Sequence, residues 1–160
     1  MTDDDRYIVV DGRRWRATDP GIPERLRTEL VAELMSARRA VGVGDDVAAA
    51  RRRVQDAKVA LGERGEPWWE AASAEGRAAR LAAVMRSLLR HRAPTSTICP
   101  SDAARVVAGD RFRTAMDEAR RAAGQLRDAG VVRTTQRGEE VDPGDAHGPI
   151  RIGRGPRWDR

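Results

Sequence analysis

The most constraining feature of this sequence is the order of its periodic segments between residues 70 and 152. Three stretches carry apolar residues at helical spacing, and proline or glycine separates them. Two β-rich stretches joined by Arg137 and Gly138 follow. These segments are residues 70–92, 100–108 and 112–129, and residues 131–136 and 140–141. This order, in which a short helix lies between two longer ones and a hairpin follows, is that of a winged helix. A winged helix is a helix-turn-helix with an appended wing.

The third helical stretch is predicted to be half-buried. Its apolar residues recur every three or four positions, and Gly130 ends it. They are Phe112, Met116, Ala119, Ala123 and Leu126. Gly109-Asp110-Arg111 has the length of a helix-turn-helix turn. In the simplest hairpin register Arg133 lies opposite Asp142 and Thr135 opposite Glu140, and residues 148–152 form one more extended piece.

The first 66 residues predict a β-hairpin and an antiparallel helix pair. Asp11-Gly12 is a two-residue turn signal that places Ile8 opposite Trp15. Two helical stretches follow, to about Val41 and from about Asp46 to Leu61, and their short glycine connection favours an αα-hairpin. Glycine and proline between residues 62 and 67 mark the boundary.

We therefore expect a mainly α-helical protein with small β-hairpins, in which a β-hairpin and an αα-hairpin precede a C-terminal winged helix. The expected segments are residues 1–66, a winged-helix domain over 67–153 and a basic flexible tail over 154–160. A chain of 160 residues can bury a core without disulfides or metal.

The positive charge is concentrated in the second half of the chain. Residues 1–70 contain 13 basic and 14 acidic side chains, whereas residues 71–160 contain 17 and 11. This distribution weakly favours a polyanionic partner for the C-terminal half. Only one basic residue, Lys58, is lysine. We attribute that bias to codon usage and draw no conclusion on recognition from it.

Several runs in the C-terminal half resemble a bacterial winged-helix domain of unknown function. They include Thr97-Ile98-Cys99-Pro100-Ser101-Asp102-Ala103-Ala104-Arg105, then Gly130-Val131-Val132, and Gly148-Pro149-Ile150-Arg151-Ile152. The resemblance covers about residues 75–153. The front segment is similar to an extension on longer members, which often carry the automatic label "biopolymer transporter Tol". The sequence departs from the family pattern at His147, where arginine is expected. The resemblance implies a fold and no activity.

DNA binding is the first functional hypothesis. The last helix of a helix-turn-helix enters the major groove, where arginine and glutamine read bases and arginine holds phosphates. A wing-tip arginine can enter a minor groove. The candidate contacts are Arg113, Arg120, Arg121, Gln125, Arg137, Arg151 and Arg154. Asp117 and Glu118 oppose this hypothesis because they lie near the end that approaches DNA.

The alternative is a non-enzymatic protein-interaction or dimerisation module that uses the winged helix as a scaffold. Trp15, Trp68 and Trp69 are the candidate partner contacts. For the adjacent tryptophans we consider packing between the two halves of the chain more probable than ligand stacking.

We predict no catalytic site, metal or cofactor. Cys99 precedes a helix, where a thiolate is favoured, but the spacing of His91 and His147 does not indicate a catalytic pair. A lone cysteine excludes an internal disulfide and a cysteine zinc cluster. The acidic N-terminus is unlike a signal peptide, and no apolar run approaches a membrane span. We therefore expect a cytoplasmic protein with no membrane association.

Overall fold

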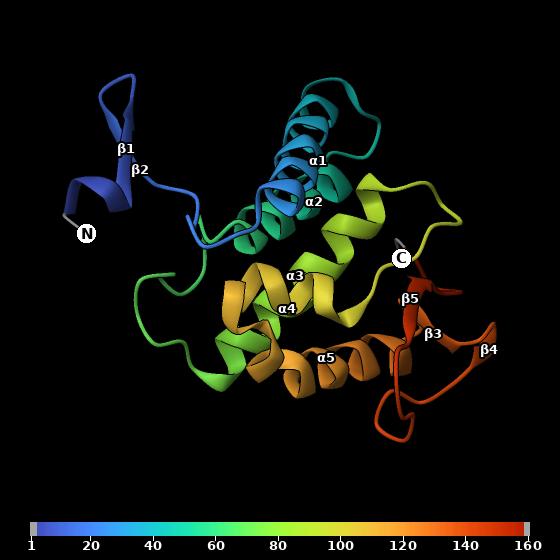
Figure 1. Cartoon of the computed structure of the whole chain (residues 1–160). Helices are drawn as coiled ribbons and strands as arrows, with labels where there is room; N and C mark the ends of the chain where they lie inside the picture. Colours follow the sequence, from blue (N-terminus) through green and yellow to red (C-terminus); the bar gives the residue numbers. More distant parts are fainter. Residues whose placement is uncertain (1–2, 159–160) are drawn as a thin grey trace.

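The structure, a computed structural model, describes residues 3–158 (Figure 1). The N-terminal part contains η1 (Asp3–Arg6), β1 (Tyr7–Val10), β2 (Arg13–Arg16), α1 (Glu24–Val43) and α2 (Val47–Ala60). The rest contains α3 (Ala74–His91), α4 (Pro100–Ala108), η2 (Gly109–Ala115), α5 (Met116–Asp128), β3 (Val132–Gln136), β4 (Glu139–Glu140) and β5 (Arg151–Arg154). Mainly helical structure with small antiparallel sheets confirms the broad fold class.

The N-terminal hairpin has the predicted register. Ile8 lies opposite Trp15. Asp11 and Gly12 both have positive φ, at 50° and 74°, as the two-residue turn requires. The hairpin stands away from the helices in Figure 1. It therefore exposes apolar side chains, with Ile8 52%, Val9 71%, Val10 49% and Trp15 38% exposed.

Helices α1 and α2 pack against each other as the predicted αα-hairpin (Figure 1). Leu26, Leu30 and Leu34 of α1 are buried along one side. The Asp46 carboxylate accepts a hydrogen bond from the Ala49 amide and caps α2. Helix α1 continues through Gly42 and ends at Val43, two residues later than predicted at Val41, with Gly44 as its C-cap.

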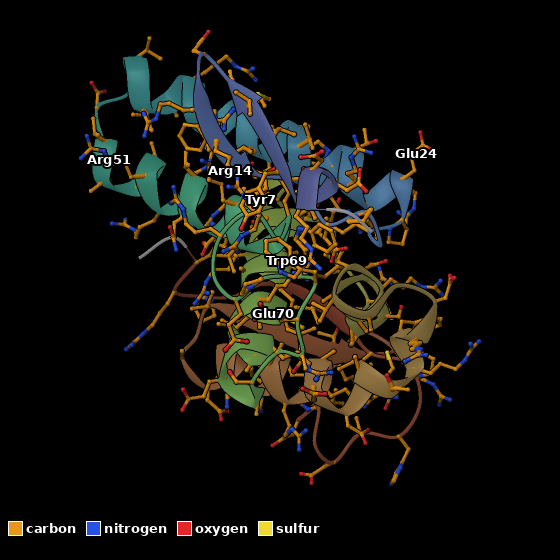
Figure 2. All side chains as sticks on the ribbon, turned by 90° about the vertical axis from the view of Figure 1, so that its left-hand side faces the viewer. Tyr7, Arg14, Glu24, Arg51, Trp69 and Glu70 are labelled. Carbon is orange, nitrogen blue, oxygen red and sulfur yellow. The ribbon has the colours of Figure 1, made fainter. Side chains whose placement is uncertain are left out.

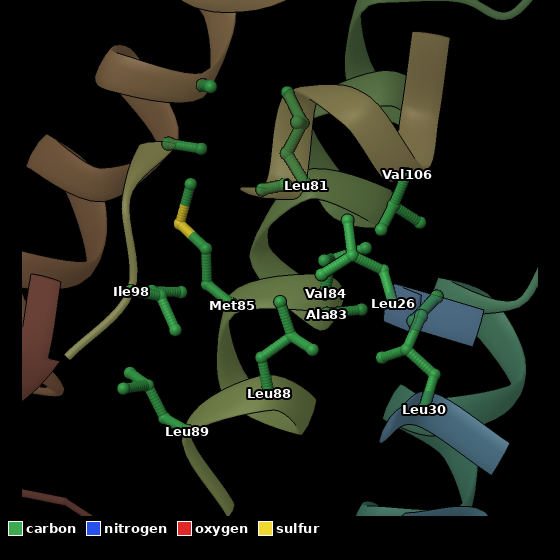
Figure 3. Close-up of a cluster of buried hydrophobic side chains, with 14 of the residues drawn as sticks. Leu26, Leu30, Leu81, Ala83, Val84, Met85, Leu88, Leu89, Ile98 and Val106 are labelled. Carbon is green, nitrogen blue, oxygen red and sulfur yellow. The ribbon is translucent and has the colours of Figure 1, made fainter. Parts of the chain in front are cut away.

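Helix α3 lies at the centre of the molecule and contacts α1, α2, α4 and α5. Figure 3 shows its side chains Leu81, Met85 and Leu88 beside residues of α1 and of the segment before α4. It begins at Ala74, so the predicted start at Glu70 is wrong. Ser73 caps it, and the Glu66 carboxylate accepts hydrogen bonds from the Ser73 amide and hydroxyl.

The predicted third helix is divided in two. Residues 109–115 form a 3-10 segment, and α5 begins only at Met116, so the predicted start at Phe112 is wrong. Gly109 has a φ of 56°, and Arg111 departs from helical geometry. Phe112 is half-buried, with the guanidinium of Arg105 3.9 Å from its ring centroid.

The C-terminal residues form a three-stranded antiparallel sheet in the order β4-β3-β5. Thr135 lies opposite Glu140, as predicted, and Thr134 lies opposite Ile152 on the other edge of β3. The extended piece predicted over residues 148–152 overlaps this third strand, which begins later, at Arg151, and ends at Arg154. Ile98, between α3 and α4, exchanges two backbone hydrogen bonds with Ile152, each 2.8 Å long.

One hydrophobic core runs through both halves of the chain. It includes Ile22 and Leu26 before residue 66, and Leu88, Ala123 and Ile152 after it. The start of the expected flexible tail also packs on this body. The Arg157 amide donates to the Gly130 carbonyl, and Trp158 lies against the core. Residues 159–160, the end of that expected tail, lie outside the described range.

Candidate nucleic-acid interface

The outward face of α5 carries two exposed, polar candidate residues, Arg121 and Gln125. They are four residues apart and therefore lie on the same side of the helix. The opposite face is buried through Ala119, Ala123 and Leu126. The short alanines let α5 lie close to α3, while the longer polar side chains project away from the core. Within residues 3–158, neither Arg121 nor Gln125 uses its side chain in an ion pair or a hydrogen bond.

Arg113 lies just before α5 and is exposed. Its guanidinium lies 4.7 Å from the centroid of the Phe112 ring. A planar guanidinium over an aromatic face can still donate hydrogen bonds from its edge. Arg113 therefore adds an exposed cation just before the N-terminus of α5.

Arg137 occupies the tip of the β3–β4 turn. Its φ of 53° and the 82° of Gly138 give the tight turn that joins the two strands. The Arg137 side chain is exposed and has no ion-pair partner among the residues that the structure describes. Beside it on the sheet, Arg133 is paired with Glu140 at 2.7 Å. Of the two arginines in the β3–β4 hairpin, Arg137 is thus the one whose guanidinium has no carboxylate partner in the described chain and can bind a ligand.

Arg120 has a different environment from its neighbour Arg121. Its guanidinium donates to the carbonyls of Pro143 and Ala146, at 3.2 and 3.0 Å, and to the carbonyl of Gly148. Arg120 therefore joins α5 to the loop between β4 and β5. Arg120, which the sequence predicts as a DNA contact, therefore uses its guanidinium to hold this loop against α5.

Arg151 and Arg154 are also engaged with the protein. Arg151 donates to the hydroxyl and carbonyl of Thr97, at 2.8 and 2.9 Å. Arg154 donates to the Leu89 carbonyl at 2.8 Å, near the end of α3, where helix carbonyls lack internal partners. These two predicted contacts therefore hold β5 against the end of α3 and the segment that follows it.

The two acidic residues that oppose DNA binding differ in their surroundings. Glu118 is half-buried and pairs with Arg77 of α3 at 3.3 Å, so much of its charge is compensated. Asp117 is exposed, and no basic side chain of the described chain pairs with it. One negative charge thus remains near the N-terminal end of α5.

The three predicted partner-contact tryptophans separate into two groups. Trp68 and Trp69 meet edge to face, with ring centroids 5.2 Å apart, and the Trp68 indole donates to the Ala17 carbonyl at 2.9 Å. The centroids of the Trp69 and Tyr7 rings lie 5.6 Å apart. Figure 2 labels both side chains. This pair connects the hairpin to the loop before α3. Trp15 remains largely on the surface, between Arg13 and Lys58.

A charge network joins the N-terminal helices to the C-terminal part. Arg92, after α3, donates two hydrogen bonds to the Glu29 carboxylate of α1, at 2.8 and 3.0 Å. The hydrogen bond from Arg92 lowers the pKa of Glu29 below its ordinary value of 4.5. Asp102 of α4 lies 3.8 Å from Arg92 and accepts the Cys99 amide at 3.0 Å. The network therefore fixes the segment that contains Ile98.

Cys99 is half-buried and serves as the N-cap position of α4. Within residues 3–158, no group of three or more histidine, cysteine, aspartate or glutamate side chains could hold a metal ion. None of the helices in this range is both long and apolar enough to cross a membrane.

One family model matches the C-terminal part of the chain. Residues 78–155 match a family described as "Protein of unknown function (DUF3253)". The match extends from α3 to the end of β5 and leaves out the hairpin and the α1–α2 pair. No curated protein matches the chain. The expected domain of unknown function over about residues 75–153 is therefore supported, without an activity.

Proposed function

We propose that residues 74–154 form a winged helix that binds duplex DNA. In this proposal α4 and α5 are the helix-turn-helix, α5 is the recognition helix and the β3–β4 turn is the wing. Two pairings support it: the single bridge between Ile98 and β5, and the pairing of β5 with β3. They join a residue between the first two helices to the sheet that follows the third helix. The unusual part is the long 3-10 connection in place of a short turn.

The observation that carries the DNA hypothesis is a set of four exposed polar side chains, called here the DNA face: Arg113, Arg121, Gln125 and Arg137. These polar side chains project from α5, its N-terminal approach and the wing tip, and no ion pair engages them within the described chain. Arg121 and Gln125 can read base edges in a major groove, and Arg137 can enter the adjacent minor groove. Arg120, Arg151 and Arg154 support the frame and make no part of this face.

The experiment is fluorescence anisotropy with a labelled duplex at low salt. We expect Arg121→Ala with Arg137→Ala to weaken binding by about tenfold or more, because each arginine contact contributes about 1–3 kcal/mol. Arg27→Ala with Arg39→Ala is the matched control. It removes two exposed arginines from α1 and should change affinity by less than about twofold. No binding to any duplex, or equal loss in both variants, would contradict the proposal.

The second candidate function is a protein-interaction module, favoured by the hairpin. Ile8, Val10 and Trp15 lie on one side of a ribbon that projects from the body, and apolar surface of this kind marks docking sites. Light scattering at several concentrations tests the dimer form of this hypothesis. A dimer that Ile8→Ser with Trp15→Ser dissociates would support it, and a strict monomer with no captured partner would count against it.

A further inference from the structure

A groove on the molecule is lined by arginines that the DNA hypothesis does not use. It lies between the N-terminal half of α2, the C-terminal half of α3 and the turn after β5, and its volume is about 760 Å³. Its basic lining residues are Arg51, Arg52, Arg53, Arg86, Arg90 and Arg157. Figure 2 labels Arg51 on the outer part of α2. Sequence reasoning missed this site, because residues from three distant segments form it.

Carboxylates compensate only part of this charge. Arg53 is paired with Glu33 at 2.7 Å, and Arg90 with Asp56 at 2.5 Å. The other acidic lining residue, Asp46, accepts the Ala49 amide as the cap of α2. The four remaining arginines, Arg51, Arg52, Arg86 and Arg157, have no ion pair within residues 3–158. The groove therefore keeps an excess of positive charge.

Two further features of the lining favour an anion with hydrogen-bond acceptors. Ala48 belongs to the first turn of α2, where the helix dipole attracts negative charge. The buried Nε1 of Trp158, also a lining residue, has no hydrogen-bond acceptor in the described protein. The unpaired arginines, the helix start and the indole converge on one concave space.

The shape of the site decides what kind of anion it fits. The groove has the size of a small-molecule site, whereas the DNA backbone binds over extended surfaces. Several guanidinium groups favour clustered phosphates, which arginine binds in a bidentate manner. We propose that this groove binds a compact polyphosphate, either inorganic or esterified to a nucleoside, independently of the proposed DNA interface.

Isothermal titration calorimetry of the full chain with inorganic triphosphate and with ATP tests this proposal. We expect both to bind the wild type at low salt, and Arg86→Gln with Arg157→Gln to weaken binding by about tenfold or more. Arg27→Gln with Arg39→Gln removes the same charge elsewhere and should change affinity by less than about twofold. A cooperative thermal unfolding transition, measured for both double variants, is the control that they are folded.

The two probes also distinguish the source of the phosphates. Equal affinities support an inorganic polyphosphate, whereas tighter binding of ATP supports a nucleotide whose base lies near Trp158. No binding of either probe by the wild type would overturn the proposal, as would equal weakening in the two double variants. If the wild type does not bind triphosphate, and Arg86→Gln with Arg157→Gln loses affinity for duplex DNA, the groove is a nucleic-acid site and the polyphosphate proposal is wrong.

Discussion

At the scale of single residues, the arginines of this chain serve distinct purposes that their neighbours determine. Arg120 and Arg121 are adjacent in sequence, yet the first binds backbone carbonyls and the second extends from the surface. The difference arises from the helix, because consecutive side chains point about 100° apart. One side chain therefore meets the loop before β5, and the other meets solvent.

Arg120→Lys tests the connecting function of that guanidinium. Lysine keeps the charge but cannot reach three separate carbonyls with a planar group. We expect the free energy of unfolding to fall by about 1–3 kcal/mol and the amides of residues 143–148 to exchange faster with solvent. Hydrogen exchange measured by mass spectrometry checks this result. Unchanged exchange in that loop would show that Arg120 does not hold it.

Glu29→Gln tests the charge network by its pH dependence. Contact with Arg92 lowers the pKa of Glu29 in the folded protein, so its stabilisation is present above the ordinary value of 4.5. The stabilisation is lost as the pH falls through the lowered pKa. We expect the wild type to have the higher Tm at neutral pH, and the difference to shrink as the pH falls below 4.5. A Tm difference that is constant with pH would contradict this interpretation.

At the scale of elements, local sequence signals determine most of the boundaries. Asp11-Gly12 predicts the hairpin register, and Pro100 marks the start of α4. Helix α5 ends in a motif that glycine permits: the Gly130 amide donates to Arg127 and the Val131 amide to Leu126, with Gly130 at a φ of 79°.

Gly130→Ala tests that helix end. The side chain would occupy a left-handed conformation, and its Cβ would lie about 3 Å from the side chain of Arg157. We expect a loss of about 1 kcal/mol or more in the free energy of unfolding, measured by urea denaturation. Gly124→Ala is the control, because it lies within α5 with open space around it and should not destabilise the protein. Equal stability of Gly130→Ala and the wild type would contradict this assignment.

The elements that sequence could not predict depend on distant contacts. The ladder between Ile98 and Ile152 joins residues far apart in the chain, and only the folded arrangement of α3 and α5 brings them together. For the same reason, periodicity could not show that Arg151 and Arg154 bind backbone carbonyls whereas Arg121 and Arg137 are exposed. Exposure of an arginine depends on which carbonyls lie within reach. The division of residues 109–129 was missed because the break depends on backbone angles at Gly109 and Arg111.

At the scale of the whole molecule, the α1–α2 pair and the C-terminal part share one core. The hydrogen bond from Arg92 to Glu29 also joins α1 to the segment after α3. The proposed DNA face belongs to α5 and the β3–β4 turn, while the arginine groove lies at the junction of α2 and α3 with the chain end. The two proposed anion sites thus use separate sets of arginines.

The most direct test of the central claim is NMR of the isotope-labelled protein during titration with a short duplex. A chain of 160 residues is small enough for backbone amides to be followed individually. The DNA proposal predicts that the largest shifts fall on α5 and on Arg137 and Gly138, with little change in the β1–β2 hairpin. Shifts confined to the hairpin or to the arginine groove, with α5 unaffected, would contradict it.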